Sequence, residues 1–169
     1  MILVLLGTQN NEFKRLLNEI ERNIENGNIT EEVIVQAGFT KNESNKMKII
    51  DMIPKNELLD LVKKANLIIT HGGVGSIQMA LQENKKVIAV PRKSKYAEHV
   101  NDHQCQIVEN FDKKGYLIGI DSVDGIEEAL KKAKDFIPVE YKKCESNIIN
   151  IIDKYLQFGV GGQKTNFFK

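Results

Sequence analysis

The expected architecture follows from twelve residues, Ala65-Asn-Leu-Ile-Ile-Thr-His-Gly-Gly-Val-Gly-Ser76. Residues 67–69 form an apolar run without polar alternation, which is typical of a central parallel strand covered on both faces. The run ends at His71, three glycines follow, and apolar residues resume helical spacing at Ile77. The pattern predicts a strand, a tight turn, and a helix that begins at Ser76.

A turn of this kind is a candidate anion site. Free N–H groups and roughly half a positive charge at the start of a helix favour a phosphate as the ligand. A lone Gly-Gly-x-Gly also occurs as a plain strand-to-helix turn, so the pattern alone leaves both interpretations open. His71 stands at a strand end, where ligands collect in open α/β sheets, although a buried structural histidine also fits this position.

The rest of the chain alternates strands and helices in the same way. We expect one Rossmann-like α/β domain over residues 1–157, with about six parallel strands and helices on both faces. Strands are expected near 2–6, 32–36, 47–52, 67–69, 86–90 and 115–120. The domain is expected to end in a long helix from about residue 140, followed by a flexible tail over residues 158–169.

Composition excludes several classes of protein. The 169 residues contain 24 Lys and Arg against 23 Asp and Glu, so no general attraction to nucleic acid is expected. The two cysteines lack disulfide or metal-site spacing, which indicates a cytoplasmic protein. The apolar run at residues 1–6 is too short for a membrane span and lacks a basic region before it. We expect neither a metal nor a cofactor.

Two further loops are candidates for the same site. The first strand ends in Gly7-Thr8-Gln9, which should open on the same edge of the sheet as His71, although a simple capping turn fits equally well. The segment 92–104 follows the fifth strand and leads into a helix from about Val100. It offers hydrogen-bonding groups suited to a polyhydroxylated ligand, or alternatively a solvated helix start: Glu98, His99, Asp102, His103 and Gln104. The first strand lacks Gly-x-Gly-x-x-Gly, which disfavours a nicotinamide dehydrogenase.

Three motifs in order carry a family resemblance: His-Gly-Gly-x-Gly-Ser at 71–76, Val-Pro at 90–91 and His-Gln at 103–104. Together they resemble the nucleotide-sugar half of GT-B glycosyltransferases, in the family 28 C-terminal type. This family includes half of the lipid II N-acetylglucosaminyltransferase and the cytosolic catalytic subunit of the dolichol-linked N-acetylglucosaminyltransferase. It also includes small bacterial catalytic subunits of capsule and exopolysaccharide assembly, which the segment 98–104 resembles most.

The resemblance implies roles for individual residues. Residues of the glycine turn would hold the donor diphosphate, with His71 stabilising the leaving group as an imidazolium: His71, Gly72, Gly73, Val74, Gly75 and Ser76. Gly7 and Thr8 would line the same cleft, and 53–55 would contact uracil. Gln104 and His103 would hold sugar hydroxyls. Many relatives carry a ribose-binding glutamate at the position of Met79, so ribose must be held differently here.

The resemblance also implies a division of labour, because a complete GT-B enzyme needs two such domains and this chain supplies one. It implies a metal-independent, UDP-sugar-dependent hexosyltransferase subunit. A membrane-associated partner subunit would bind the lipid-linked saccharide acceptor and the terminal helix, and would place the chain at the inner face of the membrane. The sequence leaves open a non-catalytic nucleotide-sugar-binding subunit, the identity of the sugar, and self-association into a homodimer. A sugar-nucleotide epimerase is disfavoured because it needs both domains in one chain.

Overall fold

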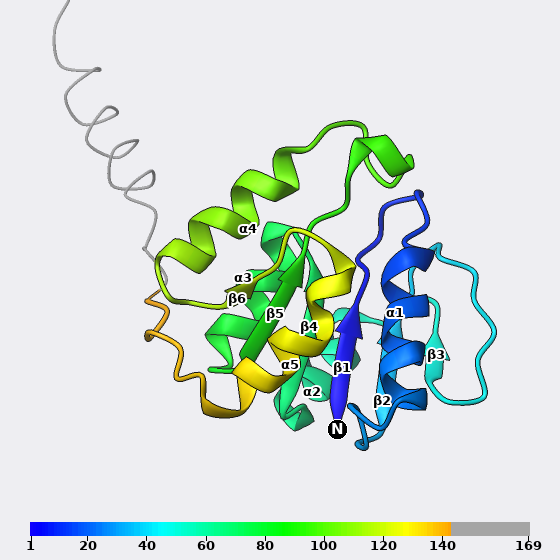
Figure 1. The fold of residues 1–169 in the computed structure, drawn as a ribbon, viewed down its shortest axis with the longest axis horizontal. Coiled ribbons are helices and arrows are strands. Elements are labelled where there is room, and N and C mark those ends of the chain that lie inside the picture. The colour runs from blue at the N-terminus through cyan, green and yellow to red at the C-terminus, as the bar shows by residue number, and fades with distance from the viewer. Residues whose placement is uncertain (143–169) are drawn as a thin grey trace, which may run out of the picture.

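A computed structural model describes residues 1–142, and within them six strands form one sheet (Figure 1). The strands are β1 (Ile2–Leu5), β2 (Val33–Gln36), β3 (Lys48–Ile50), β4 (Leu67–His71), β5 (Lys86–Val90) and β6 (Ile118–Gly119). Their order across the sheet is β3-β2-β1-β4-β5-β6, and every neighbouring pair is parallel. The order reverses between β1 and β4, so the loops after these two strands diverge to opposite sides and leave a crevice at the carboxyl edge.

Helices cover both faces of the sheet (Figure 1). They are α1 (Lys14–Glu25), α2 (Lys55–Lys64), α3 (Val74–Gln82), α4 (His103–Lys113) and α5 (Ile126–Asp135), with short 3-10 turns η1 (Ser94–Tyr96) and η2 (Val123–Gly125). The apolar faces of α1 and α5 share one core cluster with the sheet, and those of α2, α3 and α4 share the other. The expected doubly covered parallel sheet is therefore confirmed.

The central strands are apolar throughout because both of their faces are buried. Along β1, Leu3 and Leu5 join the core cluster under α3, whereas Ile2 and Val4 join the cluster under α1. Side chains that alternate between faces are all removed from water when helices lie on both sides. The same packing explains the continuous apolar run that marked β4 in the sequence.

Two helices begin at different residues from those expected. Helix α3 begins at Val74 rather than Ser76, because Gly73 already forms the extended N-cap. Helix α4 begins at His103 rather than near Val100. The preceding residues are held in turns, since the His99 ring accepts the N–H of Asn101 and the Asn101 side chain accepts that of His103. Such local side-chain bonds compete with helix formation.

The end of the described chain differs from the expected terminal helix in its first residues. Residues 140–142 are not helical, and the remainder of the expected helix and tail lies outside the described residues. Tyr141 packs against Tyr116 with ring centroids 5.3 Å apart and against Phe111 at 6.2 Å. Among the helices within residues 1–142, none has the length and apolar character needed to span a bilayer.

Candidate functional site

A cleft of about 690 Å³ lies at the carboxyl edge of the sheet, at the crevice between β1 and β4. Its walls come from the loops after β1, β3 and β4, from the first turns of α2 and from one side of α3. Six of the nine residues that we expected around a nucleotide diphosphate line it: Gly7, Thr8, His71, Gly73, Gly75 and Ser76. Gln9, Gly72 and Val74 do not line it. Met52, Ile53 and Lys55 form its far wall, where a uracil contact was expected.

The imidazole of His71 is packed between two glycines. A Cβ added at Gly7 would lie 2.6 Å from Cε1 of His71, and one added at Gly73 would lie 2.2 Å from its Nε2. Gly7 also has φ +75°, a conformation that other residues adopt at a cost. The two turns that sequence analysis placed on one edge therefore both contact the ring of His71, at its Cε1 and Nε2 atoms.

Hydrogen bonding determines which nitrogen of His71 carries the proton. Nδ1 lies 3.2 Å from the carbonyl oxygen of Leu5, which only accepts, so Nδ1 is the donor and Nε2 keeps its lone pair. Burial lowers the pKa of His71 to about 4. Without a ligand His71 is therefore neutral, because desolvation outweighs the favourable hydrogen bond to Leu5. The imidazolium that we expect with a diphosphate beside the ring stays a prediction.

Gln36, at the end of β2, was not among the predicted site residues. Its buried side chain accepts the N–H of Gly7 at 3.2 Å and donates to the carbonyls of Gly7 at 3.0 Å and Asp51 at 3.3 Å. One amide thereby ties the loop after β1 to the loop after β3. The available sequence signal was a polar residue closing an otherwise apolar strand.

Gln104 has a structural role that sequence analysis did not foresee. It is buried, and its Oε1 accepts the N–H of Gly72 at 3.1 Å and that of Arg92 at 3.1 Å. The N–H of Gly72, which we expected to face a diphosphate, is therefore already satisfied within the protein. A Cβ at Gly72 would also lie 2.7 Å from Cβ of Gln104.

The other four residues of the predicted sugar-binding segment do not line the cleft. Glu98 is buried, and its carboxylate receives two hydrogen bonds from Arg15, at 3.0 and 2.9 Å. Asp102 is exposed, and the Ser94 N–H at 2.7 Å lowers the pKa of its carboxyl group. His99 and His103 also lie in the loop before α4 and at its start. The structure thus makes Glu98 part of the loop's interior rather than a free ligand group.

Helix α3 runs along one wall of the cleft. Ser76, Met79 and Glu83 follow one another at about one-turn spacing on the side that lines it, and Gln82 lies beside them. Met79 therefore occupies the wall where relatives were expected to place a ribose-binding carboxylate. The nearest carboxylate on this wall is Glu83, at the end of the helix.

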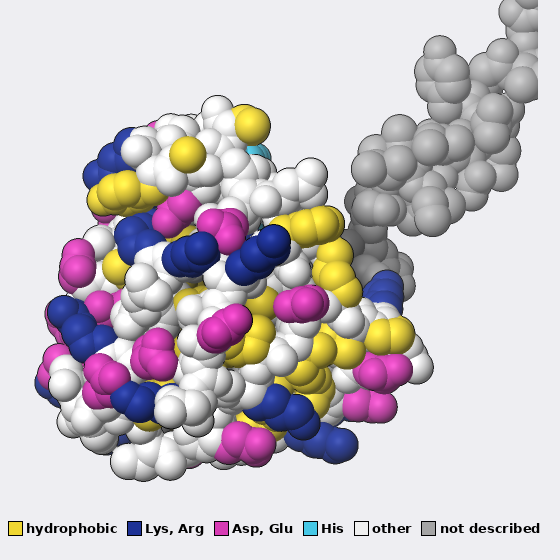
Figure 2. All heavy atoms as spheres, turned by 90° about the vertical axis from the view of Figure 1, so that its right-hand side faces the viewer, with side chains coloured by type: hydrophobic (Ala, Val, Ile, Leu, Met, Phe, Trp, Pro, Cys, Tyr) yellow, Lys and Arg dark blue, Asp and Glu magenta, His cyan; other side chains and the backbone are white. Residues whose placement is uncertain are grey.

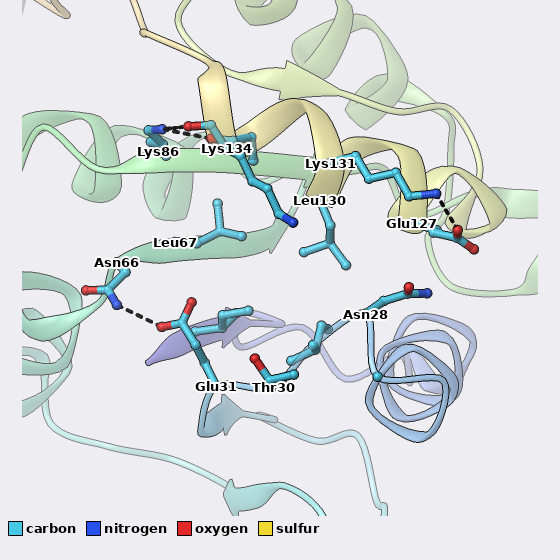
Figure 3. Close-up of a pocket in the computed structure, with 14 residues that line it drawn as sticks. Asn28, Thr30, Glu31, Asn66, Leu67, Lys86, Glu127, Leu130, Lys131 and Lys134 are labelled. Atoms are coloured by element: carbon cyan, nitrogen blue, oxygen red, sulfur yellow. Dashed lines mark hydrogen bonds and ion pairs between the residues drawn. The ribbon is translucent and has the colours of Figure 1, made fainter.

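A second hollow, of about 500 Å³, lies at the opposite, amino edge of the sheet (Figure 3). Lys86 there donates to the carbonyls of Ala133 and Lys134, both at 2.8 Å, and Asn66 donates to Glu31 at 2.7 Å. None of the predicted site residues lines this hollow. Across residues 1–142, no cluster of His, Cys, Asp and Glu side chains could hold a metal ion.

The strand order and the glycine turns at its reversal define a doubly wound α/β domain with a ligand cleft at the carboxyl edge. The chain belongs to the glycosyltransferase family 28 C-terminal domain family, whose profile matches residues 1–154. It is 33% identical over 89 residues to UDP-N-acetylglucosamine transferase subunit ALG13 of Candida glabrata. That alignment covers 50% of this chain and 42% of the relative, so the chain matches less than half of that protein.

Solved structures share the fold. The S. aureus MnaA–UDP structure superposes with a TM-score of 0.64 at 17% identity, covering 99% of this chain and 48% of that one. The solution structure of ALG13 superposes with a TM-score of 0.57 at 18% identity, covering 89% of this chain and 93% of that one. The calicheamicin glycosyltransferase CalG4 superposes with a TM-score of 0.58 at 18% identity, covering 79% of this chain and 34% of that one. At these identities the comparisons establish the fold alone.

Proposed function

We propose that this chain is the donor-binding, catalytic subunit of a two-component glycosyltransferase that takes a sugar from a UDP-sugar. One observation carries the proposal: in a family 28 domain, two glycine turns pack against the ring of His71 at a cleft. The cleft volume of about 690 Å³ lies within the ~300–1,000 Å³ usual for small-molecule sites.

The diphosphate of the donor would lie over the first turn of α3. Gly73 caps this helix without a side-chain hydrogen bond, so N–H groups of the first turn remain for a ligand. A Cβ at Gly75 would meet nothing within 4 Å, which leaves room for phosphate oxygens. The helix terminus and these N–H groups would stabilise the charge that develops on the leaving group, so no metal is needed in this proposal.

His71 would change its protonation state when the donor binds. Without a ligand its Nε2 is an acceptor and cannot donate to a phosphate. A diphosphate beside the ring favours the imidazolium, because opposite charges at short range raise the pKa of a histidine. The protonated Nε2 then donates a hydrogen bond to the leaving group.

A second polypeptide would bring the acceptor. The name of the Candida glabrata relative, a transferase subunit, supports a second polypeptide. Figure 2 shows hydrophobic side chains, in yellow, scattered over one face of the molecule. Five of the large exposed hydrophobic side chains of the described residues lie on loops at the carboxyl edge or at the start of α3: Phe39, Met52, Val74, Tyr96 and Val100. A partner facing the cleft would cover these side chains.

The finer assignment follows the family resemblance of the segment 98–104. In this proposal the reaction would belong to exopolysaccharide or capsule biosynthesis, with a lipid-linked saccharide as acceptor and a membrane-associated partner. The chain would then work at the cytoplasmic face of the membrane, held there by that partner.

The test combines binding and transfer. UDP titrated onto the chain, alone and with its partner, should give a calorimetric signal, and His71→Ala should reduce sugar transfer by the assembled pair about 10²–10³-fold. Absence of UDP binding in both preparations would contradict the proposal. UDP binding with no transfer would instead identify a non-catalytic nucleotide-sugar-binding subunit.

A further inference from the structure

Arg92 is a buried cation that the proposed reaction does not use directly. It follows β5, has 1% of its surface exposed, and is among the largest fully buried side chains of the described chain. Its guanidinium donates through Nη2 to the carbonyl of Leu6 at 2.9 Å and through Nη1 to that of Asn11 at 2.5 Å. Nη1 also lies 3.3 Å from the carbonyl of Glu98.

These contacts join two loops that are far apart in the sequence. We call residues 7–13 the first loop and residues 92–102 the second loop. The Asn11 side chain donates to the carbonyl of Ala97 at 2.8 Å, which adds a second connection between them. Arg15 at the start of α1 pairs with Glu98, and the Glu98 carboxylate also accepts the N–H of Lys93. The two loops are therefore joined by the buried Arg92 and also by the more exposed contacts of Asn11 and Arg15.

The network reaches the cleft without exposing Arg92 to it. Leu6, whose carbonyl Arg92 binds, immediately precedes Gly7, which packs against His71. The backbone N–H of Arg92 shares the Gln104 oxygen with Gly72, in the glycine turn that also packs against that ring. Arg92 itself is not among the residues that line the cleft.

We propose that Arg92 is a positioning residue, whose buried guanidinium holds the first loop against the second loop in the one arrangement that binds the donor. The role in donor binding rests on the proposed function above. A planar guanidinium suits this task, because its N–H donors point in fixed directions and can reach carbonyls on separate segments. A lysine ammonium is a point charge on a flexible stem and cannot reproduce that geometry.

Two observations describe the surroundings of the Arg92 guanidinium. The guanidinium carbon lies over the Phe13 ring, 5.0 Å from its centroid, within the range of a cation–π contact. Burial lowers the pKa of Arg92 to about 10, so the group stays charged at neutral pH although it is desolvated. Its two Nη groups bond the carbonyls of Leu6, Asn11 and Glu98, whereas its buried Nε has no hydrogen-bond partner among the described residues.

Arg92→Lys and Arg92→Met test the proposal, with Leu130→Ala as a control that removes buried apolar volume at the amino edge. Amide hydrogen exchange in both loops and the calorimetric Kd for UDP are the readouts. Both Arg92 variants should exchange about tenfold faster in residues 7–13 and 92–102, and should bind UDP about tenfold or more weakly. The control should keep its Kd for UDP within about twofold, although its overall stability falls.

Arg92→Lys retains the charge and is the variant that decides the question if Arg92→Met does not fold. Wild-type exchange in both loops of Arg92→Lys, or a wild-type Kd for UDP in that variant, would overturn the proposal. The exchange readout needs no ligand. If the unmodified chain binds no UDP either alone or with its partner, the proposed function fails, while exchange in the two loops still decides whether Arg92 holds them.

Discussion

The cleft at the carboxyl edge and the hollow at the amino edge are similar in volume, about 690 and 500 Å³, but they are built differently. Around the first, buried polar side chains hydrogen-bond the loop backbone: Gln36, His71, Arg92 and Gln104. Around the second, the polar groups are mostly exposed or partly exposed side chains that pair with one another or cap a helix end (Figure 3). Volume alone therefore does not distinguish a prepared site from a surface depression.

The difference also appears in the glycines of the two edges. Gly38 at the carboxyl edge and Gly27 at the amino edge both have positive φ, +62° and +74°. A Cβ at Gly38 would lie 2.2 Å from the carbonyl oxygen of Gly7, whereas one at Gly27 would meet nothing within 4 Å. The backbone is tightly packed only where the loops must hold one shape.

The strongest challenge to this contrast is the pair Gly38→Ala and Gly27→Ala. Both variants place alanine at a positive φ, but only the new Cβ at position 38 would collide with backbone. We therefore expect the free energy of unfolding to fall by about 2–5 kcal/mol in Gly38→Ala and by about 1–2 kcal/mol in Gly27→Ala. Urea denaturation measures both. Equal losses would show that the carboxyl-edge loops are no more tightly constrained than the amino edge.

A pH titration examines the buried ring itself. The unfolded chain binds a proton at His71 near pH 6.5 and the folded chain only near pH 4, so stability is fully present above pH 6.5 and falls as the pH drops towards 4. The loss should reach about 3 kcal/mol. His71→Gln should remove this part of the slope in urea denaturation series, while His103→Gln, at an exposed histidine, should leave it intact.

Gly75→Ala is expected to change UDP binding in the cleft without lowering the stability of the fold. The added methyl group meets no protein atom, and alanine favours a helix by up to about 1 kcal/mol over glycine, so stability should hold or rise slightly. The same methyl group would occupy the space assigned to the diphosphate, and we expect UDP affinity to fall about tenfold or more. An unchanged affinity for UDP would show that the diphosphate does not bind at the first turn of α3.

The smallest expected effect belongs to the amino edge. Lys86→Met removes the ammonium that caps the last carbonyls of α5, and should cost about 0.3–1 kcal/mol of stability. UDP binding should not change. A clear loss of UDP affinity in calorimetry would mean that the two edges are coupled and that the contrast drawn here is incomplete.

Much of the fold could be predicted because its causes are local or periodic. Apolar runs marked the six strands, and helical spacing marked the five helices, with errors mainly at element ends. Those errors have physical reasons: Gly73 caps α3 early, and side-chain bonds around Asn101 delay α4. Proximity of the turns at Gly7 and His71 was also predictable, because parallel strands end on one edge of the sheet.

The internal partners of the site were not predictable. Glu98 and Gln104 are polar residues in a loop, and nothing local distinguishes a ligand group from one that binds a distant backbone. Gln36 and Arg92 reach partners 15 to 86 positions away in the chain. Their roles depend on which loops the sheet brings together, and hydrogen-bond partners of that range carry no periodic pattern.

The sequence by itself determined the class of fold, the edge on which the turns meet and the family to which the motifs point, because strand and helix patterns follow from burial along short segments. Only the tertiary structure decided that His71 is neutral without a ligand, that the Gly72 N–H is already bonded and that Arg92 joins two loops. Desolvation and long-range hydrogen bonds depend on atoms from separate segments. They exist only once those segments have packed.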